Sequence, residues 1–307
     1  MTIRLLSRVI WFSFAASLVM TTQAEAQVTT VGGVLNQLTT SWSAFPSLLS
    51  AAAYVLGLIF SARGVFMFKD HVDGDKNNHV PLSTAVKHFL SGGMLFSLPF
   101  MSSAVMANLL GTGAPVVGFT STHQDPGIGG LDEMVIQFIG NIAGPATYML
   151  IGFAYISAIL LLITAITRMT KTAQEGPRGP AGIGTLMTFI ASGALFSVGQ
   201  MIGVFSSSLF GTNVVSTYAT ISQNVLPAAD EAIVAPVIES LMIFIMIVGY
   251  IAFIRGWFVL KSFADGNSQA TLAQGLTFLI GGALAINLGD LVNVLQKTVN
   301  VAGITFQ

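Results

Sequence analysis

Six long apolar stretches, separated by short segments that hold most of the charge, constrain this chain more than any other feature. The stretches lie at residues 43–68, 89–110, 134–167, 183–210, 236–260 and 275–292. Each has at least 18 residues, and a membrane-spanning helix needs roughly 17–25. Only 8% of the residues are charged and 53% are hydrophobic, whereas about a quarter of a soluble domain is charged. We therefore expect an all-α membrane protein with six transmembrane helices.

Residues 1–26 have the pattern of a secretory signal peptide. Arg4 and Arg8 precede an apolar run at 9–20, and Ala24-Glu25-Ala26 forms a small-x-small cleavage site. The alternative is an uncleaved first membrane helix, but twelve apolar residues are short for a hydrocarbon layer of ~30 Å. Cleavage would leave the mature N-terminus on the periplasmic side of a bacterial inner membrane.

The cations indicate the same topology. After residue 27 the chain has ten Lys and Arg residues, and nine of them lie in or beside the connections that follow the first, third and fifth stretches. With a periplasmic N-terminus these connections are cytoplasmic, as the positive-inside rule requires. Six of these cations are predicted at the cytoplasmic interface: Arg63, Lys69, Arg168, Lys171, Arg255 and Lys261.

Arg63 and Arg255 are predicted deeper in the membrane than the other interface cations. Each precedes a lysine by six residues, which is ~9 Å along a helix. Two explanations are open. The side chains extend to the cytoplasmic lipid phosphates, or they form a buried pair with a partner subunit or a lipid head group. Trp257 and Trp42 fit interfacial anchors on the inner and outer sides.

A motif recurs three times and predicts three copies of one helical hairpin. Phe-x3-Gly-x-Leu occurs at 89–95, 189–195 and 278–284, and Arg-Gly-x4-Lys occurs at 63–69 and 255–261. An even number of stretches separates the copies, so they have the same orientation, unlike the inverted repeats of many transporters. We expect parallel-repeat hairpins at 27–118, 119–220 and 221–307.

The small residues of the returning helices are predicted to be helix-packing sites. A missing side chain lets two helix backbones approach closely in a membrane. The sites are Gly92, Gly93, Gly193, Gly281 and Gly282. A ligand contact or a hinge is the alternative, and the spacing leaves open whether the packing is within one chain or between subunits.

The sequence predicts no catalytic, metal or cofactor site. There is no cysteine, so the chain has no disulfide and no thiolate nucleophile. Metalloprotease, phosphate-loop and nucleophile-elbow motifs are missing. Residues 73–77 resemble the start of a calcium loop, but the twelfth position is Thr84 in place of the required glutamate. With a net charge of -1, direct nucleic-acid binding is not expected.

A few polar residues and prolines are the weak candidates for a transport pathway. Glu239 and Asp290 lie near predicted outer helix ends, where shallow placement competes with a role in a proton or ion relay. A transporter would also need a broken helix or a polar site within the membrane. The weak candidates for these in the apolar stretches are Pro99, Pro145 and Asn141.

The three-hairpin pattern resembles the small polytopic inner-membrane components of type IVB (Dot/Icm-like) secretion and plasmid conjugation systems, such as the DotE/IcmC, DotV and DotP/IcmD families. The resemblance rests on Gly64, Lys69, Phe89, Gly93 and Leu95 and their matches in the third copy, over about two thirds of the chain. It implies a non-catalytic channel or scaffold subunit of an apparatus that transfers DNA or effector proteins.

The resemblance also implies the partners. These are the lipid bilayer, other subunits of the complex and a possible homo-oligomer. Relatives of this kind are mostly shorter, with one or two hairpins, so the subunit number does not carry over. Two other hypotheses remain: a small-solute transporter or ion channel, and an assembly factor or immunity-like protein.

Overall fold

The computed structural model is almost entirely helical. It describes residues 30–42, 44–73, 80–110, 131–171, 173–211, 219–221, 228–300 and 304–306. The predicted signal peptide lies outside these residues. The helices are α2 (Val31–Trp42), α3 (Ala44–Asp73), α4 (Leu82–Leu110), α5 (Leu131–Met169), η1 (Ala173–Arg178), α6 (Ile183–Phe196), α7 (Val198–Phe210), α8 (Ala228–Ala264), α9 (Leu272–Ile286) and α10 (Leu288–Val299).

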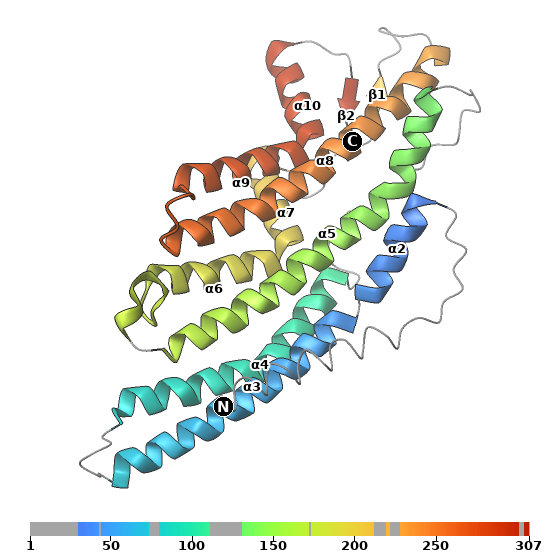
Figure 1. The fold of residues 1–307 in the computed structure, drawn as a ribbon. Coiled ribbons are helices and arrows are strands. Elements are labelled where there is room, and N and C mark those ends of the chain that lie inside the picture. Colours follow the sequence, from blue (N-terminus) through green and yellow to red (C-terminus); the bar gives the residue numbers. More distant parts are fainter. Residues whose placement is uncertain are drawn as a thin grey trace.

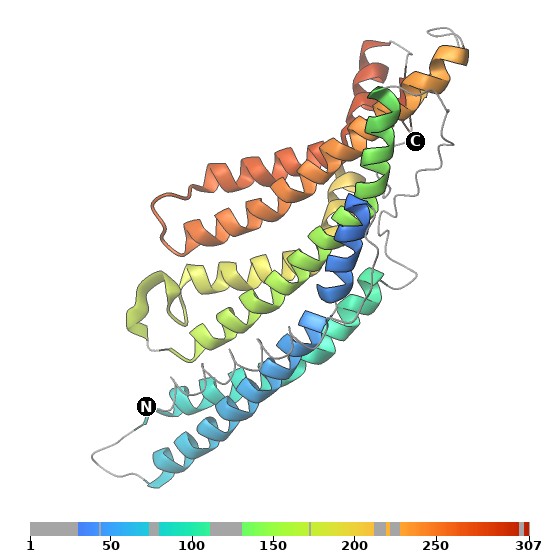
Figure 2. The same ribbon diagram turned by 45° about the vertical axis from the view of Figure 1, so that its right-hand side comes forward.

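Three pairs of helices lie side by side and form an open fan (Figure 1). The pairs are α3 with α4, α5 with α6, and α8 with α9. The second pair lies in the middle, because α5 contacts α4 on one side and α8 on the other. Figure 2 shows that the C-terminal ends of α3, α5 and α8 lie on one side of the molecule, so the three pairs run in the same sense.

Two of the returning helices are broken. The axis turns by 84° between α6 and α7 and by 78° between α9 and α10. Ser197 and Asn287 lie at these breaks. In α4 the helix continues past the corresponding region, with Pro99 inside it. The breaks leave α6 and α9 with 14 and 15 residues, which is ~22 Å and shorter than a bilayer's hydrocarbon layer.

The apolar helices identify a membrane protein, with fewer clear spans than the sequence predicted. Three stretches of the described chain are long and apolar enough to cross a bilayer: Val31–Asp73, Glu133–Met169 and Val234–Ala264. The number rises to five if each bent pair is one span. The predicted span at 89–110, in α4, is not among them, so the count of six is not confirmed.

In each helix pair, a small residue of the returning helix packs against the backbone of the first helix. A Cβ added at Gly92 would lie 2.9 Å from the carbonyl oxygen of Gly57. A Cβ added at Gly282 would lie 2.8 Å from the carbonyl oxygen of Gly249. Only glycine leaves room for this approach, which gives the backbones close dispersion contact.

The middle pair uses a hydrogen bond at the same place. The Ser192 hydroxyl donates to the carbonyl oxygen of Ala158 over 2.9 Å. The contact defines equivalent positions in the three pairs. In the first helices they are Gly57, Ala158 and Gly249, and in the returning helices Gly92, Ser192 and Gly282.

This packing corrects the alignment of the third copy by one residue. The Phe-x3-Gly-x-Leu motif aligns Gly93 with Gly282, but in the structure Gly92 is the residue that packs as Gly282 does. The same shift is seen three residues earlier. Phe89 lies against Gly64 of α3, and the residue that lies against the matching Gly256 of α8 is Leu279. A shift of one residue rotates a helix face by about 100°, so facing side chains, and not the motif, decide the register.

A small sheet ties the end of the described chain to α8. Strands β1 (Ala219–Ile221) and β2 (Ile304–Phe306) are antiparallel. The Asn293 amide of α10 donates to the carbonyl of Phe306 over 2.7 Å and accepts from its N–H over 2.9 Å. Phe306 is buried against Met242 of α8, so this segment packs on the third helix pair.

Candidate functional site

A buried ion cluster joins the second and third helix pairs at the end where the cations gather. Arg168, in the last turn of α5, donates to both carboxylate oxygens of Asp265, over 2.6 Å and 3.1 Å. Lys261, in the last turn of α8, contacts the same carboxylate at 2.8 Å. The Asp265 and Arg168 side chains are almost fully buried. Two-pronged contacts of this kind are the strong form of an ion pair.

Helix α6 is shaped to let this cluster form. The Arg168 guanidinium also donates to the Thr188 hydroxyl over 3.1 Å, and that hydroxyl donates to the carbonyl of Gly184 over 2.6 Å. A Cβ on Gly184 would lie 2.5 Å from an Asp265 carboxylate oxygen. Glycine is therefore required at this position, because any side chain would push the carboxylate away from the guanidinium.

The cluster controls the charge of its carboxylate. Burial would raise the pKa of Asp265, but hydrogen bonds from Arg168 and Lys261, together with their positive charges, outweigh it and hold the pKa below the ordinary value of 3.8. Asp265 therefore stays ionised at neutral pH, with two cations facing one anion. The cluster keeps one unit of positive charge at this end of the helices.

The predicted interface cations fall into two groups. Arg168 and Lys261 meet at Asp265. The others are exposed: Arg63, Lys69, Lys171 and Arg255. Arg255 lies over the ring of Phe278, 4.7 Å from its centroid, a cation–π arrangement. Neither Arg63 nor Arg255 is buried by the chain itself, so pairing with a partner subunit or a lipid head group stays a prediction for both. Arg168 makes a buried pairing within the same chain.

Sequence reasoning missed Asp265. It follows Lys261 by four residues, and an i, i+4 pair of opposite charge at a helix end is a detectable signal. The partner on α5 is 97 residues away, and no local pattern points to it. Trp257 was predicted as an interfacial anchor, but it is buried and stacks edge-on against Phe253 with ring centroids 6.4 Å apart.

The predicted packing glycines also divide into two groups. Gly92 and Gly282 lie against the partner helix of their own pair. Gly93, Gly193 and Gly281 are exposed, and a Cβ added at any of them would meet nothing within 4 Å. Against the part of the chain that the structure describes, these three positions are open. A packing role for them stays a prediction.

A second polar group lies at the break between α9 and α10. Asn287 is buried, and its amide donates to the carbonyl of Ala283 over 2.8 Å. Its Oδ1 atom is buried without a hydrogen-bond partner. Glu239 and Asp290 are also buried by other parts of the chain. Their depth in a membrane, shallow or within a relay, stays a prediction. Asp290 lies in the first turn of α10, where a carboxylate is favoured by the helix dipole.

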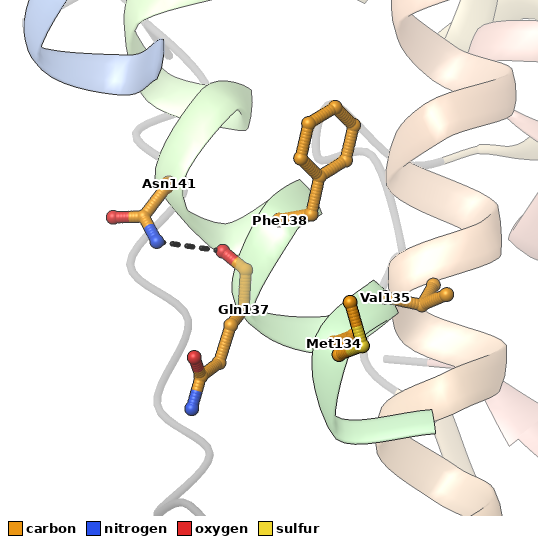
Figure 3. Close-up of a pocket in the computed structure, with 5 residues that line it drawn as sticks. All are labelled: Met134, Val135, Gln137, Phe138 and Asn141. Atoms are coloured by element: carbon orange, nitrogen blue, oxygen red, sulfur yellow. Dashed lines mark hydrogen bonds between the residues drawn. The ribbon is translucent and has the colours of Figure 1, made fainter. Parts of the chain in front are cut away.

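Asn141 and Pro145, two of the weak pathway candidates, do not lie at these breaks. Asn141 is exposed on α5, and its amide donates to the carbonyl of Gln137 over 2.8 Å, within the same helix (Figure 3). It lines a shallow pocket with Met134, Val135, Gln137 and Phe138, all on one helix. The pocket is mostly apolar and offers no converging polar groups. Pro145 lies inside α5, which continues through it.

The described residues contain no group of three or more His, Asp or Glu side chains that could hold a metal ion. What the arrangement does chemically is electrostatic: the Asp265 carboxylate, at the end of α8, pairs with Arg168 of α5 and Lys261 of α8, and the Thr188 hydroxyl of α6 joins through Arg168. No protein family, curated protein or solved structure matches the chain.

Proposed function

We propose that this chain is a non-catalytic integral inner-membrane subunit of a transfer apparatus of the type IVB secretion and conjugation kind, acting in its channel or scaffold. The observation that carries the proposal is the open row of three helix pairs, which run in one sense and share one packing register. Among the described residues, the pocket on α5 is open and mostly apolar and does not lie between the helix pairs. The row presents long apolar faces, as a scaffold subunit requires.

The proposed topology has six spans, three hairpins in parallel repeat and a cleaved signal peptide. Each returning helix, bent or straight, counts as one span. Eight of the nine described cations lie on or beside the ends of α3, α5 and α8 and the starts of α4 and α6, and this end would be cytoplasmic. The mature N-terminus would then be periplasmic. Reporter fusions near Lys76 and Arg178 test this topology, and periplasmic signals there would contradict it.

The first helix pair supports a role in a larger assembly. Of the apolar window in the span Val31–Asp73, 12% is buried inside the chain, compared with 50% in Val234–Ala264. Apolar faces left open to this extent must be covered by lipid or by protein. A subunit surrounded by partners has such a surface, and a self-contained transporter buries more of it.

Deletion of the gene tests the proposed function directly. We expect the deletant to lose transfer of DNA or effector protein while small-solute uptake is unchanged. Complementation with the intact chain should restore transfer, and complementation with Gly184→Leu should fail because the ion cluster cannot form. Normal transfer in the deletant would exclude the proposal.

The second candidate, a small-solute transporter or ion channel, is favoured by one observation. Transporter sites are formed where membrane helices break, and α9 breaks at the buried Asn287, next to Asp290. The test uses purified chain in proteoliposomes. Ion or solute flux that disappears in Asn287→Leu and Asp290→Asn, but not in the exposed-surface control Thr298→Ala, would favour this candidate.

A further inference from the structure

Helices α3 and α9 are the two ends of the row. Within the described residues, neither has another helix pair on its outer side, whereas the middle pair has one on both sides. Within the described residues, α5 packs against the first pair and α8 against the second. No pair precedes α3 or follows α9 (Figure 1). Because the three pairs share one register, each end helix can be compared position by position with helices that do have a neighbour.

The first helices differ most at the position eight residues after their packing small residue. This position is Val65 in α3, Ile166 in α5 and Trp257 in α8, counted from Gly57, Ala158 and Gly249. Ile166 and Trp257 are 1% and 8% exposed, but Val65 is 55% exposed. The side chain is large and apolar in all three copies, yet it is covered only in the two that follow another pair.

The position directly after the packing residue repeats this difference. Ile159 and Tyr250 are 0% and 2% exposed, whereas Leu58 is 62% exposed. Leu58 and Val65 are seven residues apart, two helical turns, so they lie on the same face of α3. That face has the apolar character of an interface and has no partner within the described chain.

The returning helices give the complementary face. The position before the packing residue is Ser91 in α4, Ala191 in α6 and Gly281 in α9. Ser91 and Ala191 are completely buried. Gly281 is exposed, and an added Cβ would meet nothing within 4 Å. A small residue is thus kept at a close-packing position that is occupied in the first two copies and open in the third.

A control position shows that this difference is specific. Two residues before the packing residue, Leu90, Ile190 and Ile280 are exposed to the same degree in all three pairs. This face has no neighbour in any copy and is the face expected to contact lipid. The loss of burial at Leu58, Val65 and Gly281 therefore marks the missing neighbours and not a general difference between the pairs.

We propose that the chain assembles head to tail with copies of itself, with α9 of one copy packing against α3 of the next. A second copy of the chain is the expected partner because the same kind of interface already exists inside the chain. There the first helix pair packs against the second, and between copies the third pair would pack in the same way against the first pair of the next copy. The Ser91 hydroxyl donates to the carbonyl of Ile166 over 3.5 Å. By equivalence, Gly281 lies beside Val65 of the next copy. An interface between two different faces forms rings or open arrays, not two-fold dimers.

The test is cysteine cross-linking of the full chain in lipid nanodiscs or native membranes, which is clean because the natural sequence has no cysteine. We expect the Val65→Cys/Gly281→Cys double variant to give a ladder of multimers on oxidation or with a short bismaleimide. Each single variant should stay uncross-linked, and a mixture of the two single variants should stop at dimers. The matched control, Val65→Cys/Ile280→Cys, should give no ladder. Thermal melting shows whether each variant is folded.

Three results would overturn the proposal. A double variant that is folded but remains monomeric under these conditions would show that the faces of α3 and α9 do not meet. A single variant that cross-links to itself would show a two-fold contact. Cross-links in membranes only to a different protein would assign the face to another subunit. The inference does not rest on the proposed apparatus, since transfer and self-assembly are measured separately and either can fail alone.

Discussion

Arg168 and Asp265, 97 residues apart in the sequence, form a buried ion pair with contacts of 2.6 Å and 3.1 Å that connects the end of α5 to the end of α8. Lys261 approaches the same carboxylate at 2.8 Å. The second and third helix pairs are therefore connected by charge at one end, in addition to their apolar contacts.

Removing one partner of this ion pair should destabilise the chain strongly. Arg168→Met leaves a buried carboxylate with one cation and should lower the free energy of unfolding by roughly 3–5 kcal/mol. Arg168→Lys should recover only part of this, because an ammonium cannot make the two-pronged contact. Chemical denaturation in maltoside micelles measures both variants.

Replacing both partners at once is the matched control. Arg168→Met/Asp265→Leu removes the charges together and should be far milder than either single change, since buried pairs are often replaceable by apolar residues of similar size. Equal destabilisation in the single and double variants would contradict the geometry of the cluster.

The contribution of Asp265 to stability should depend on pH only in acid. Because its pKa in the folded chain lies below the unfolded value of 3.8, the contribution is fully present above that value. It is lost as the pH falls through the lower folded pKa. The difference in melting temperature between the natural chain and Asp265→Asn should be constant from about pH 5 to 8 and shrink below about pH 3.8. A difference that shrinks between pH 7 and 5 would contradict the direction of the shift.

Neighbouring glycines of α4 should respond differently to the same substitution. Gly92→Leu places a side chain where the carbonyl of Gly57 lies 2.9 Å from the added Cβ, so it should separate α3 from α4 and cost about 3 kcal/mol or more. Gly93→Leu points into open space and should leave the stability of the purified monomer nearly unchanged. Trypsin sensitivity and melting temperature compare the two variants.

Gly93→Leu has a second use. If it weakens the native complex in the membrane without affecting the monomer, Gly93 is a packing site and the packing is between subunits, one of the two arrangements that the sequence left open. If complex and monomer are both unaffected, the packing assignment of Gly93 is wrong. Gly193→Leu, whose added side chain also meets open space, makes the same comparison in the middle pair.

Trp257 should tolerate loss of its indole N–H. The side chain is buried against Phe253, and the Nε1 atom has no hydrogen-bond partner. A buried donor without a partner costs about 1–3 kcal/mol. Trp257→Phe should therefore be neutral or stabilising, whereas Trp257→Ala should lose about 3–5 kcal/mol through the cavity it leaves. Strong destabilisation by Trp257→Phe would show that the N–H is bonded in the membrane.

The helical class and the membrane character could be predicted from sequence because they depend on local properties. Apolar stretches of sufficient length and clustered cations indicate membrane helices wherever they occur. The Phe-x3-Gly-x-Leu motif placed the first two copies in the register that the packing shows, at Phe89 and Phe189. The third copy came out one residue away, because the motif begins at Phe278, whereas Leu279 is the residue that packs against α8 as Phe89 packs against α3.

Local sequence patterns could not predict which face of each helix packs against a neighbouring helix. The bends at Ser197 and Asn287 were not predicted, since both lie in stretches whose hydropathy continues across them. Gly92 and Gly93 are equivalent by composition, and only the contact with Gly57 separates them.

The sequence by itself determined that this chain is a helical membrane protein with most of its cations clustered between apolar stretches, because bilayer thickness and charge placement act on each segment independently. Only the tertiary structure decided that, of the described cations, Arg168 is the one that is buried, that Asp265 is its partner, and that no further helix pair among the described residues lies beside α3 or α9. Those facts depend on which surfaces come together across a hundred residues of chain, and side-chain contact at that range leaves no periodic signal in the sequence.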